Sequence, residues 1–372
     1  MNRYRVSTRH FLLGVALLLF GYAAAIYVID PLQHYRKASW YQPVFTNQRF
    51  INPGLAKHYP YDTVIIGTSM TENFLPSSVD SILGVHSLKL SIEGASAYEQ
   101  RIMLQTAIRT GKVKQVIWGV DLLTFEGETQ RLKNGKGSLP FYLFDDPLWN
   151  DYRYLLNIDI AKKYLSKIAL GNLFGMKAYR QPLEKFQYWG DDFTPAAQRL
   201  YARAEAFAAQ PQPHDAAPLN RSYLEGLENS MEYNMAEIIR ENPEIRFTLF
   251  FPPYSALFWA ERVQEKKWNE LLLFKRYIVD RLLPFSNVAL YDFQDIEAVT
   301  FDFGHYKDAT HYAPSVNTFM LRAFKEGTYR LGNDNAGQKI GALKEQIARF
   351  PEIMRQYKNA PASPAIRGIY EQ

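Results

Sequence analysis

The chain of 372 residues contains no cysteine. This absence excludes a disulfide scaffold, a thiolate zinc site, an iron–sulfur cluster and a cysteine nucleophile together. Charge is also scarce, at 22% of residues, and 43 Lys and Arg against 38 Asp and Glu leave a formal net charge of only +5. The basic residues are scattered rather than gathered in a stripe, so nothing supports nucleic-acid binding. There is no internal repeat, and the length can supply one large or two medium cores.

One long hydrophobic run is present, at the N-terminus. Residues 11–29 contain no charged side chain, and three arginines precede them within the first nine residues. Nineteen residues that rise ~1.5 Å each span about 28 Å, which is enough to cross a bilayer core. A cleaved signal peptide is the alternative, because the three alanines at 23–25 resemble a cleavage site. The apolar run continues past them to Ile29, which favours an uncleaved transmembrane anchor.

The charges on either side of this run indicate its orientation. Asp30 follows the run at once, and Arg36 and Lys37 lie slightly further on, so the excess of positive charge before the run is modest. This excess predicts a single-pass cell-membrane protein with a cytoplasmic N-terminus. The rest of the chain is then expected to be periplasmic or extracellular.

Five short apolar segments after the anchor alternate with helical patterns. They are 62–66, 86–90, 115–120, 246–251 and 288–291. Continuous apolar runs of this length indicate strands that are buried on both faces. Their alternation with helices predicts an α/β fold, a three-layer α/β/α sandwich around a mainly parallel five-stranded sheet.

The pattern divides the chain into parts. We expect an anchor (1–30), a proline-containing membrane-proximal connector (31–58), an α/β domain (59–333) and a C-terminal helix and tail (334–372), the tail frayed over 360–367. An insertion at about 126–218 separates the third and fourth strands. We expect it to contain a helix around 152–170 and an Ala/Pro/Gln-rich loop over 202–218. An amphipathic helix follows the insertion and ends at Asn242-Pro243. We expect the insertion to cap the carboxyl ends of the strands, where ligands bind in open α/β sheets.

A serine follows the first predicted strand, in the segment Gly67-Thr68-Ser69. A Ser hydroxyl where a strand hands over to a helix is exposed at the top of the sheet, and the first amides of the helix can stabilise an anion beside it. The alternative requires no function. Ser69 with Glu72 three residues later has the pattern of a helix capping box.

A hydroxyl nucleophile needs a base, normally a histidine with an acceptor on its other ring nitrogen. Asp308 lies three residues before His311, and the same spacing occurs in Asp302 and His305. The later pair is favoured because it follows the fifth strand and directly precedes Pro314, which opens the next predicted helix, whereas His305 is interpreted as a surface or loop histidine. Carboxylates and imidazoles are also metal ligands, but these four side chains lie within ten residues, closer together than most metal sites require.

Together, a Gly-x-Ser after the first strand, a glycine after the second and an Asp-x-x-His before a late helix resemble the SGNH (GDSL-like) hydrolase superfamily. The resemblance covers roughly residues 60–330 without the insertion. It implies a flavodoxin-like sheet, Ser69 as nucleophile, His311 as base and Asp308 as its orienting partner. The backbone amides of Ser69 and Gly94 would form the oxyanion hole. Neither a cofactor nor a metal is implied.

The third conserved block of that superfamily is where this chain departs. Many members place an Asn after a Gly there, whereas this chain has Asp121 after Gly119-Val120, and an ionised Asp cannot donate a hydrogen bond. Three alternatives remain: a hole with two donors, a contribution from a neighbour such as Asn73, or a structural role for Asp121. Losing one donor typically costs about a hundredfold in rate. Acyl transfer to a positioned sugar hydroxyl remains feasible.

An anchor followed by such a domain is similar to the cell-surface proteins of alginate O-acetylation and teichoic acid D-alanylation. This resemblance implies an O-acyltransferase or esterase that acts on a cell-envelope polysaccharide. If it transfers acyl groups, a polytopic membrane acyltransferase is its expected partner. The alternative is a non-catalytic glycan-binding or scaffold subunit of an envelope-modification complex.

Overall fold

The computed structural model describes residues 2–209 and 218–359. Contacts within the chain divide it into two compact units. The first comprises Met1–Pro60 and Gly137–Phe186, and we call it the anchor unit. The second comprises Tyr61–Lys136 and Gln187–Gln372, and we call it the sheet unit. Much of the predicted insertion therefore groups with the predicted connector.

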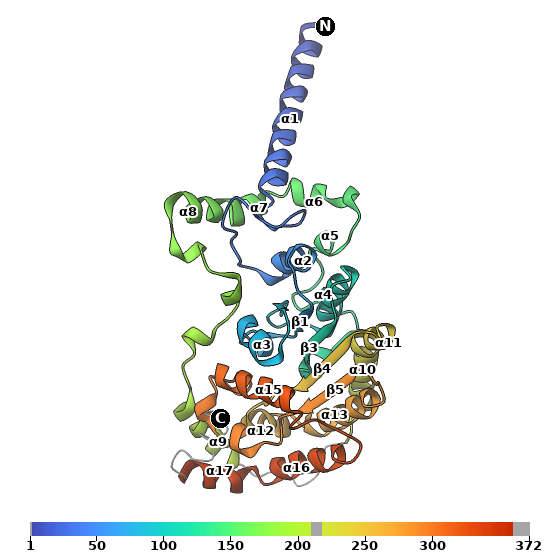
Figure 1. Ribbon diagram of the computed structural model, residues 1–372, viewed down its shortest axis with the longest axis vertical. Helices are drawn as coiled ribbons and strands as arrows, with labels where there is room; N and C mark the ends of the chain where they lie inside the picture. The colour runs from blue at the N-terminus through green and yellow to red at the C-terminus, as the bar shows by residue number, and fades with distance from the viewer. Residues whose placement is uncertain (1, 210–217, 360–372) are drawn as a thin grey trace. The chain divides into compact units, whose positions relative to one another are not determined.

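The sheet unit contains a five-stranded, all-parallel sheet in the order β2-β1-β3-β4-β5 (Figure 1). Its strands are β1 (Thr63–Ile66), β2 (Ser87–Lys89), β3 (Gln115–Gly119), β4 (Arg246–Phe251) and β5 (Val288–Asp292). Each lies within one residue of its predicted bounds at either end. Nearly every strand residue is buried, as expected for a parallel sheet covered by helices.

The helices of the sheet unit follow the strands in the chain. They are α3 (Pro76–Leu83), α4 (Ala97–Arg109), α9 (Ala197–Ala208), α10 (Arg221–Met231), α11 (Glu237–Glu241), α12 (Ala256–Gln264), α13 (Trp268–Leu282), α14 (Glu297–Thr300), α15 (Pro314–Glu326), α16 (Ala336–Ala348) and α17 (Phe350–Asn359). The predicted helix before Asn242 is present as α10, a π-helical turn and α11, with its apolar face buried.

The order of the strands defines where a ligand can bind. β1 pairs with β2 on one side and with β3 on the other, although both follow it in the chain. The direction of winding therefore reverses at β1 and β3. In open α/β sheets the ligand crevice lies outside the carboxyl ends of the strands at this switch point. Ser69 follows β1 and Asp121 follows β3, so both lie at this position.

Two local predictions in the sheet unit were wrong. The loop predicted over 202–218 begins inside α9, which forms because Leu200 and Ala204 bury one face of an alanine-rich segment. Residues 210–217 lie outside the described part. The single helix predicted after the core is two helices, α16 and α17, and the tail predicted at 360–367 also lies outside the described residues.

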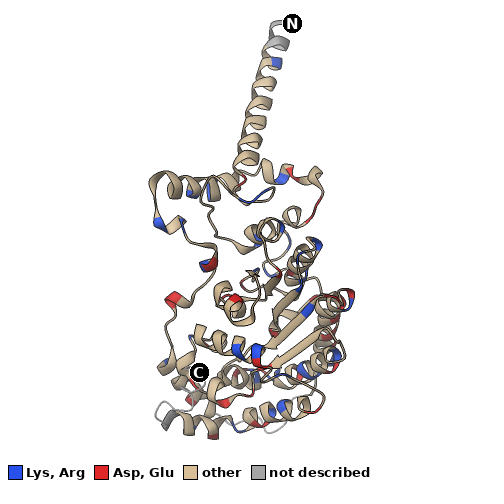
Figure 2. Ribbon diagram, in the orientation of Figure 1, with Lys and Arg blue, Asp and Glu red and all other residues tan. Residues whose placement is uncertain are grey.

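The anchor unit consists of helices. They are α1 (Asn2–Ile29), α2 (Gln48–His58), α5 (Phe141–Phe144), α6 (Tyr152–Leu155), α7 (Ile158–Ile160) and α8 (Ser166–Phe174). Residues 7–29 of α1 are long and apolar enough to span a membrane, and Figure 2 shows almost no charged residue along this helix. The predicted helix around 152–170 is interrupted, because Asn157 leaves the helical conformation and caps α7 with its side chain.

The predicted connector contains structured residues. Asp30 has a φ of +51° and is 1% exposed. Its carboxylate accepts hydrogen bonds from three backbone amides, at residues 34–36, and from the Tyr154 hydroxyl at 2.8 Å. Ile51 and Leu55 of α2 are fully buried. These contacts fold the chain after α1 onto the inserted helices of the same unit.

Candidate active site

Ser69 begins a short 3₁₀ turn, Ser69–Thr71, directly after β1. The helix predicted to follow the strand here is only this 3₁₀ turn, and α3 begins at Pro76. The capping-box interpretation is also wrong, because the side chain of Thr68 caps the turn by accepting from Met70 N. Ser69 is partly exposed between buried neighbours. Its hydroxyl is therefore available for an interaction across the site.

The side chains of Ser69, His311 and Asp308 form a continuous hydrogen-bonded chain. Ser69 Oγ lies 2.7 Å from His311 Nε2. His311 Nδ1 lies 2.8 and 2.9 Å from the two carboxylate oxygens of Asp308. An ionised carboxylate only accepts, so Nδ1 carries the proton and Nε2 is left to accept the proton of the serine. This is the geometry of a nucleophile, a base and its orienting group.

The environment of Asp308 keeps its carboxylate ionised. Partial burial would raise its pKa, but hydrogen bonds from the His311 ring and from the amides of His311 and Thr310 outweigh this effect. The net result is that the pKa of Asp308 lies well below its usual range. An aspartate that stays ionised can hold the histidine in one tautomer and stabilise the imidazolium formed when the serine is deprotonated.

The earlier Asp-x-x-His pair lies apart from this chain of hydrogen bonds. His305 Nε2 is 3.5 Å from Asp302 Oδ2, and the pKa of His305 is lowered by burial, an effect that the Asp302 charge only partly offsets. Among residues 2–209 and 218–359, no group of three His, Asp or Glu side chains is arranged to hold a metal ion. The four residues thus form two separate pairs.

Tyr312 braces the site and was missed by the sequence analysis. Its hydroxyl donates to the Met70 carbonyl at 2.8 Å, and its side chain is almost fully buried. The residue after His311 thus holds the residue after Ser69. No pattern in the sequence signals this bond, because its partners are 242 positions apart.

Thr71 fills the space beneath the Ser69 turn. Its hydroxyl donates to the Thr68 carbonyl and lies 2.6 Å from Ser91 Oγ. A Cβ at Gly67, whose φ is +152°, would lie 2.7 Å from Thr71 Cγ2, and one at Gly119 would lie 2.8 Å from the same atom. Both positions therefore need glycine so that the threonine can fit.

The expected oxyanion donors lie on neighbouring segments. Ile92 N donates to Gly67 O at 3.0 Å, which joins the segment after β2 to the end of β1. Among the described residues, the amides of Ser69 and Gly94 have no acceptor. Gly94 has a φ of +57°, and a Cβ built there would lie 3.3 Å from Lys133 Cε. The ammonium of Lys133, which the sequence analysis did not single out, thus lies close to one expected donor.

Asp121 has a structural role in the geometry. Its carboxylate accepts from the hydroxyls of Tyr254 and Thr68 at 2.6 and 3.2 Å. It also accepts from Leu123 N at 3.2 Å. Of the three alternatives left open by the sequence, these contacts favour a structural Asp121 that holds the segment before Ser69.

Asn73, the other auxiliary candidate, lines a cavity of about 120 Å³. Asn317 lines the same cavity, and both side chains are at least 97% buried with amide groups that have no partner among the described residues. Neither Ser69 nor His311 lines this cavity. The contacts of Asn73 therefore do not support a role as the third oxyanion donor.

Trp189 and Lys307 flank the base, and both were missed. The rings of Trp189 and His311 are nearly perpendicular, with 5.7 Å between the ring centres, and Lys307 Nζ lies 3.7 Å from the centre of the indole. Ala196 N donates to the carbonyl of Tyr306, and the Arg199 side chain donates to the carbonyl of Lys307. These bonds hold the segment after Trp189 against the loop that carries His311. Within the described residues of the sheet unit, two parts of the predicted cap therefore lie beside the site: Lys133, next to Gly94, and the segment that begins at Trp189.

No protein-family model and no curated protein matches the chain. The family resemblance therefore stays a prediction, and the function has to be argued from the geometry of the site.

Proposed function

We propose that the protein is a membrane-anchored serine acyl-transfer enzyme, an O-acyltransferase or esterase, that acts on a cell-envelope polysaccharide. The observation that carries this proposal is the hydrogen-bonded chain from Ser69 through His311 to Asp308. Nucleophile, base and orienting acid come from opposite ends of the sequence and meet with the distances that acyl transfer requires.

The reaction follows from these positions. Ser69 Oγ attacks the carbonyl carbon of an ester while His311 Nε2 takes the hydroxyl proton. The negative charge on the carbonyl oxygen is stabilised by the amides of Ser69 and Gly94. The tetrahedral intermediate then expels the alcohol, which leaves with the proton from His311, and an acyl-Ser69 ester remains. Water or an acceptor hydroxyl enters by the same steps in reverse and regenerates the serine.

An anionic acceptor is supported by the charges beside the site. Lys133 lies close to Gly94, and Lys307 is stacked on Trp189 next to the base. Two ammonium groups beside the site would attract a polymer that carries carboxylates or phosphates. Transfer would need an acyl donor from a polytopic membrane acyltransferase, whereas hydrolysis would need only water.

The proposal includes a fold and a location. The strand order β2-β1-β3-β4-β5 and the position of Ser69 at the switch point support a flavodoxin-like, three-layer sandwich of the SGNH kind. The apolar helix α1 supports a single-pass anchor. We propose that the N-terminus is cytoplasmic and the sheet unit periplasmic or extracellular.

The test is covalent labelling of the full-length protein with a fluorophosphonate, followed by peptide mapping. We expect the label on Ser69, and we expect Ser69→Ala and His311→Gln to abolish both labelling and hydrolysis of acetyl esters. His305→Gln is the matched control, because it removes the equivalent histidine of the pair that does not contact the serine. The alternative, a non-catalytic subunit, predicts a different result. The wild-type protein would stay unlabelled, and it would bind envelope glycan with the same affinity as the Ser69→Ala variant.

A further inference from the structure

Exposed apolar side chains are concentrated in the anchor unit. Outside α1, ten large hydrophobic side chains among the described residues are exposed in this unit and only one, Leu273, in the sheet unit. Soluble surfaces seldom gather so many, and a large exposed apolar patch marks an interaction site. Eight of them lie on or beside α6, α7 and α8, and we call the six most exposed of these the platform: Leu148, Trp149, Tyr152, Ile158, Leu173 and Phe174.

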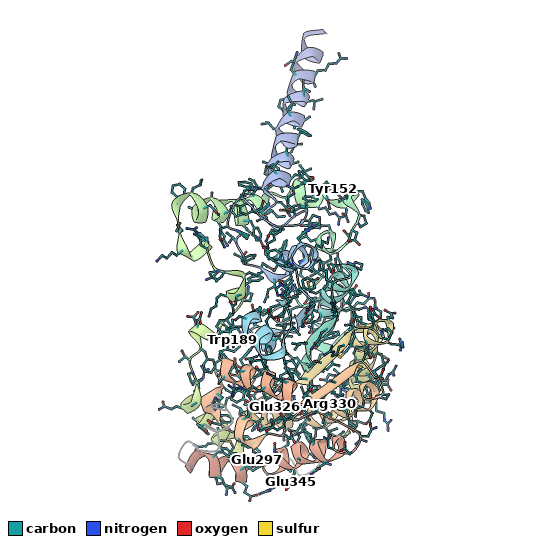
Figure 3. The ribbon with its side chains drawn as sticks, viewed as in Figure 1. Tyr152, Trp189, Glu297, Glu326, Arg330 and Glu345 are labelled. Carbon is teal, nitrogen blue, oxygen red and sulfur yellow. The ribbon has the colours of Figure 1, made fainter. Side chains whose placement is uncertain are left out.

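The position of the platform along α1 is fixed by contacts within the unit. The Tyr22 hydroxyl donates to the Asn157 carbonyl at 2.8 Å, and α6 packs on α1. Tyr22 lies seven residues before the end of α1, which is about 10 Å along a helix axis. Figures 1 and 3 show α6, with Tyr152, and α8 running across the end of α1. The corner between α6 and α7 is thus level with the last turns of the apolar helix.

Charge in the chain is divided unequally between the units. The anchor unit has 14 Lys and Arg against six Asp and Glu, a net charge of +8, whereas the sheet unit has 29 against 32, a net charge of −3. Lys162, Lys163 and Lys167 lie between the two apolar ends of the platform. Basic residues next to exposed Trp, Tyr and Leu side chains are typical of protein that lies in the interface of an anionic membrane.

We propose that the platform is embedded in the headgroup region of the bilayer that α1 spans, and that its lysines contact anionic phospholipid headgroups. In this position Trp149 and Tyr152 would lie at the depth where membrane proteins carry their aromatic belts. The anchor unit is then held to the membrane at two places, by a spanning helix and by a surface that lies flat. This inference rests on the proposed membrane anchor α1, and it does not depend on the chemistry of Ser69.

The absence of cysteine allows a direct test in the full-length protein. Single cysteines replace Leu148 and Leu173 on the platform, Leu17 on α1 as a lipid control and Leu273 as an aqueous control. Each is spin-labelled in bilayer discs of phosphatidylcholine with phosphatidylglycerol. Collisions with oxygen, which concentrates in lipid, are compared with collisions with a water-soluble nickel chelate.

We expect the label at 17 to favour oxygen over the chelate most strongly and the label at 273 to favour the chelate. The labels at 148 and 173 should lie between these two, because they are placed at headgroup depth. Platform labels that match 273 while 17 is in lipid would overturn the proposal and would fit a surface that docks on another protein. A label at 17 that is exposed to water would overturn the anchor and the platform together.

The lysines are tested by replacing Lys162, Lys163 and Lys167 with glutamine in the Leu173→Cys protein. The label should become more accessible to the chelate in discs that contain phosphatidylglycerol and should not change in pure phosphatidylcholine. An equal change in both lipids would overturn the proposed contact with anionic headgroups.

Discussion

Tyr312 links the two parts of the candidate site, and its hydroxyl is the most informative group to remove. This hydroxyl donates to the carbonyl of Met70 at 2.8 Å, and both residues are at least 96% buried. Met70 follows Ser69 and Tyr312 follows His311. The bond therefore sets the spacing of two turns whose functional side chains meet at 2.7 Å.

The change Tyr312→Phe removes the hydroxyl and keeps the ring. A buried carbonyl that loses its donor lowers the free energy of unfolding by about 1–3 kcal/mol. If the two turns then separate by about 1 Å, the rate falls by about a hundredfold. Urea denaturation followed by circular dichroism measures the first effect, and initial rates of acetyl ester hydrolysis without denaturant measure the second.

Tyr306→Phe is the matched control. Tyr306 is equally buried, pairs with Tyr312 in an antiparallel bridge and donates its hydroxyl to the Pro253 carbonyl at 2.8 Å. This variant should lose similar stability and keep its hydrolysis rate, because Pro253 does not adjoin Ser69. Equal losses of rate in both variants would show that the hydroxyl of Tyr312 acts only through stability and would refute the reasoning.

Two further substitutions test the orienting acid and the packing below the serine. Asp308→Asn should lower the hydrolysis rate by about ten-thousandfold, because an amide can hold the wrong tautomer. Because the pKa of Asp308 is depressed in the folded state, its contribution to stability is complete above the ordinary aspartate pKa of ~3.9 and is lost as the pH falls further. The difference in free energy of unfolding between the wild type and Asp308→Asn should therefore shrink below pH ~4. A difference that grows there would contradict this reasoning. Gly119→Ala places a Cβ 2.8 Å from Thr71 Cγ2 and 3.3 Å from Phe250 Cζ, so it should destabilise the protein by about 1–3 kcal/mol. Gly226→Ala is the control, because this glycine lies in α10 and no atom is within 4 Å of the new Cβ. It should be neutral or stabilise the protein by up to about 1 kcal/mol. In thermal denaturation the midpoint should therefore fall for Gly119→Ala and stay the same or rise for Gly226→Ala.

The strands, and the three residues whose side chains meet in the candidate site, could be located because their signals are local. A strand such as Arg246–Phe251 is a continuous run of large apolar and β-branched residues between Arg246 and two prolines, and it appears in the structure with the same bounds. Asp308 and His311 are three positions apart, and Ser69 directly follows a strand. Each signal fits inside one short segment.

Contacts between distant segments could not be predicted in this way. Tyr254 reaches Asp121 across 133 positions, and Trp189 reaches His311 from a segment with no periodic pattern. The end of α9 was assigned to a loop because alanine-rich segments also occur in loops. Only the burial of Leu200 and Ala204 distinguishes the helix from a loop here. The division into two units likewise depends on which segments pack together.

The structure also explains how a serine can be held at this corner without a long helix behind it. From the β3 side, Asp121 accepts from the hydroxyl of Thr68, the residue before Ser69. From the histidine side, Tyr312 donates to the carbonyl of Met70, the residue after Ser69. Each neighbour of the serine is thus fixed by a long-range hydrogen bond. An aspartate at position 121 cannot donate to an oxyanion, but it can accept from three donors at once, and an asparagine accepts through one oxygen only. The departure from the SGNH pattern is therefore better explained by the need to hold the Ser69 turn than by lost chemistry.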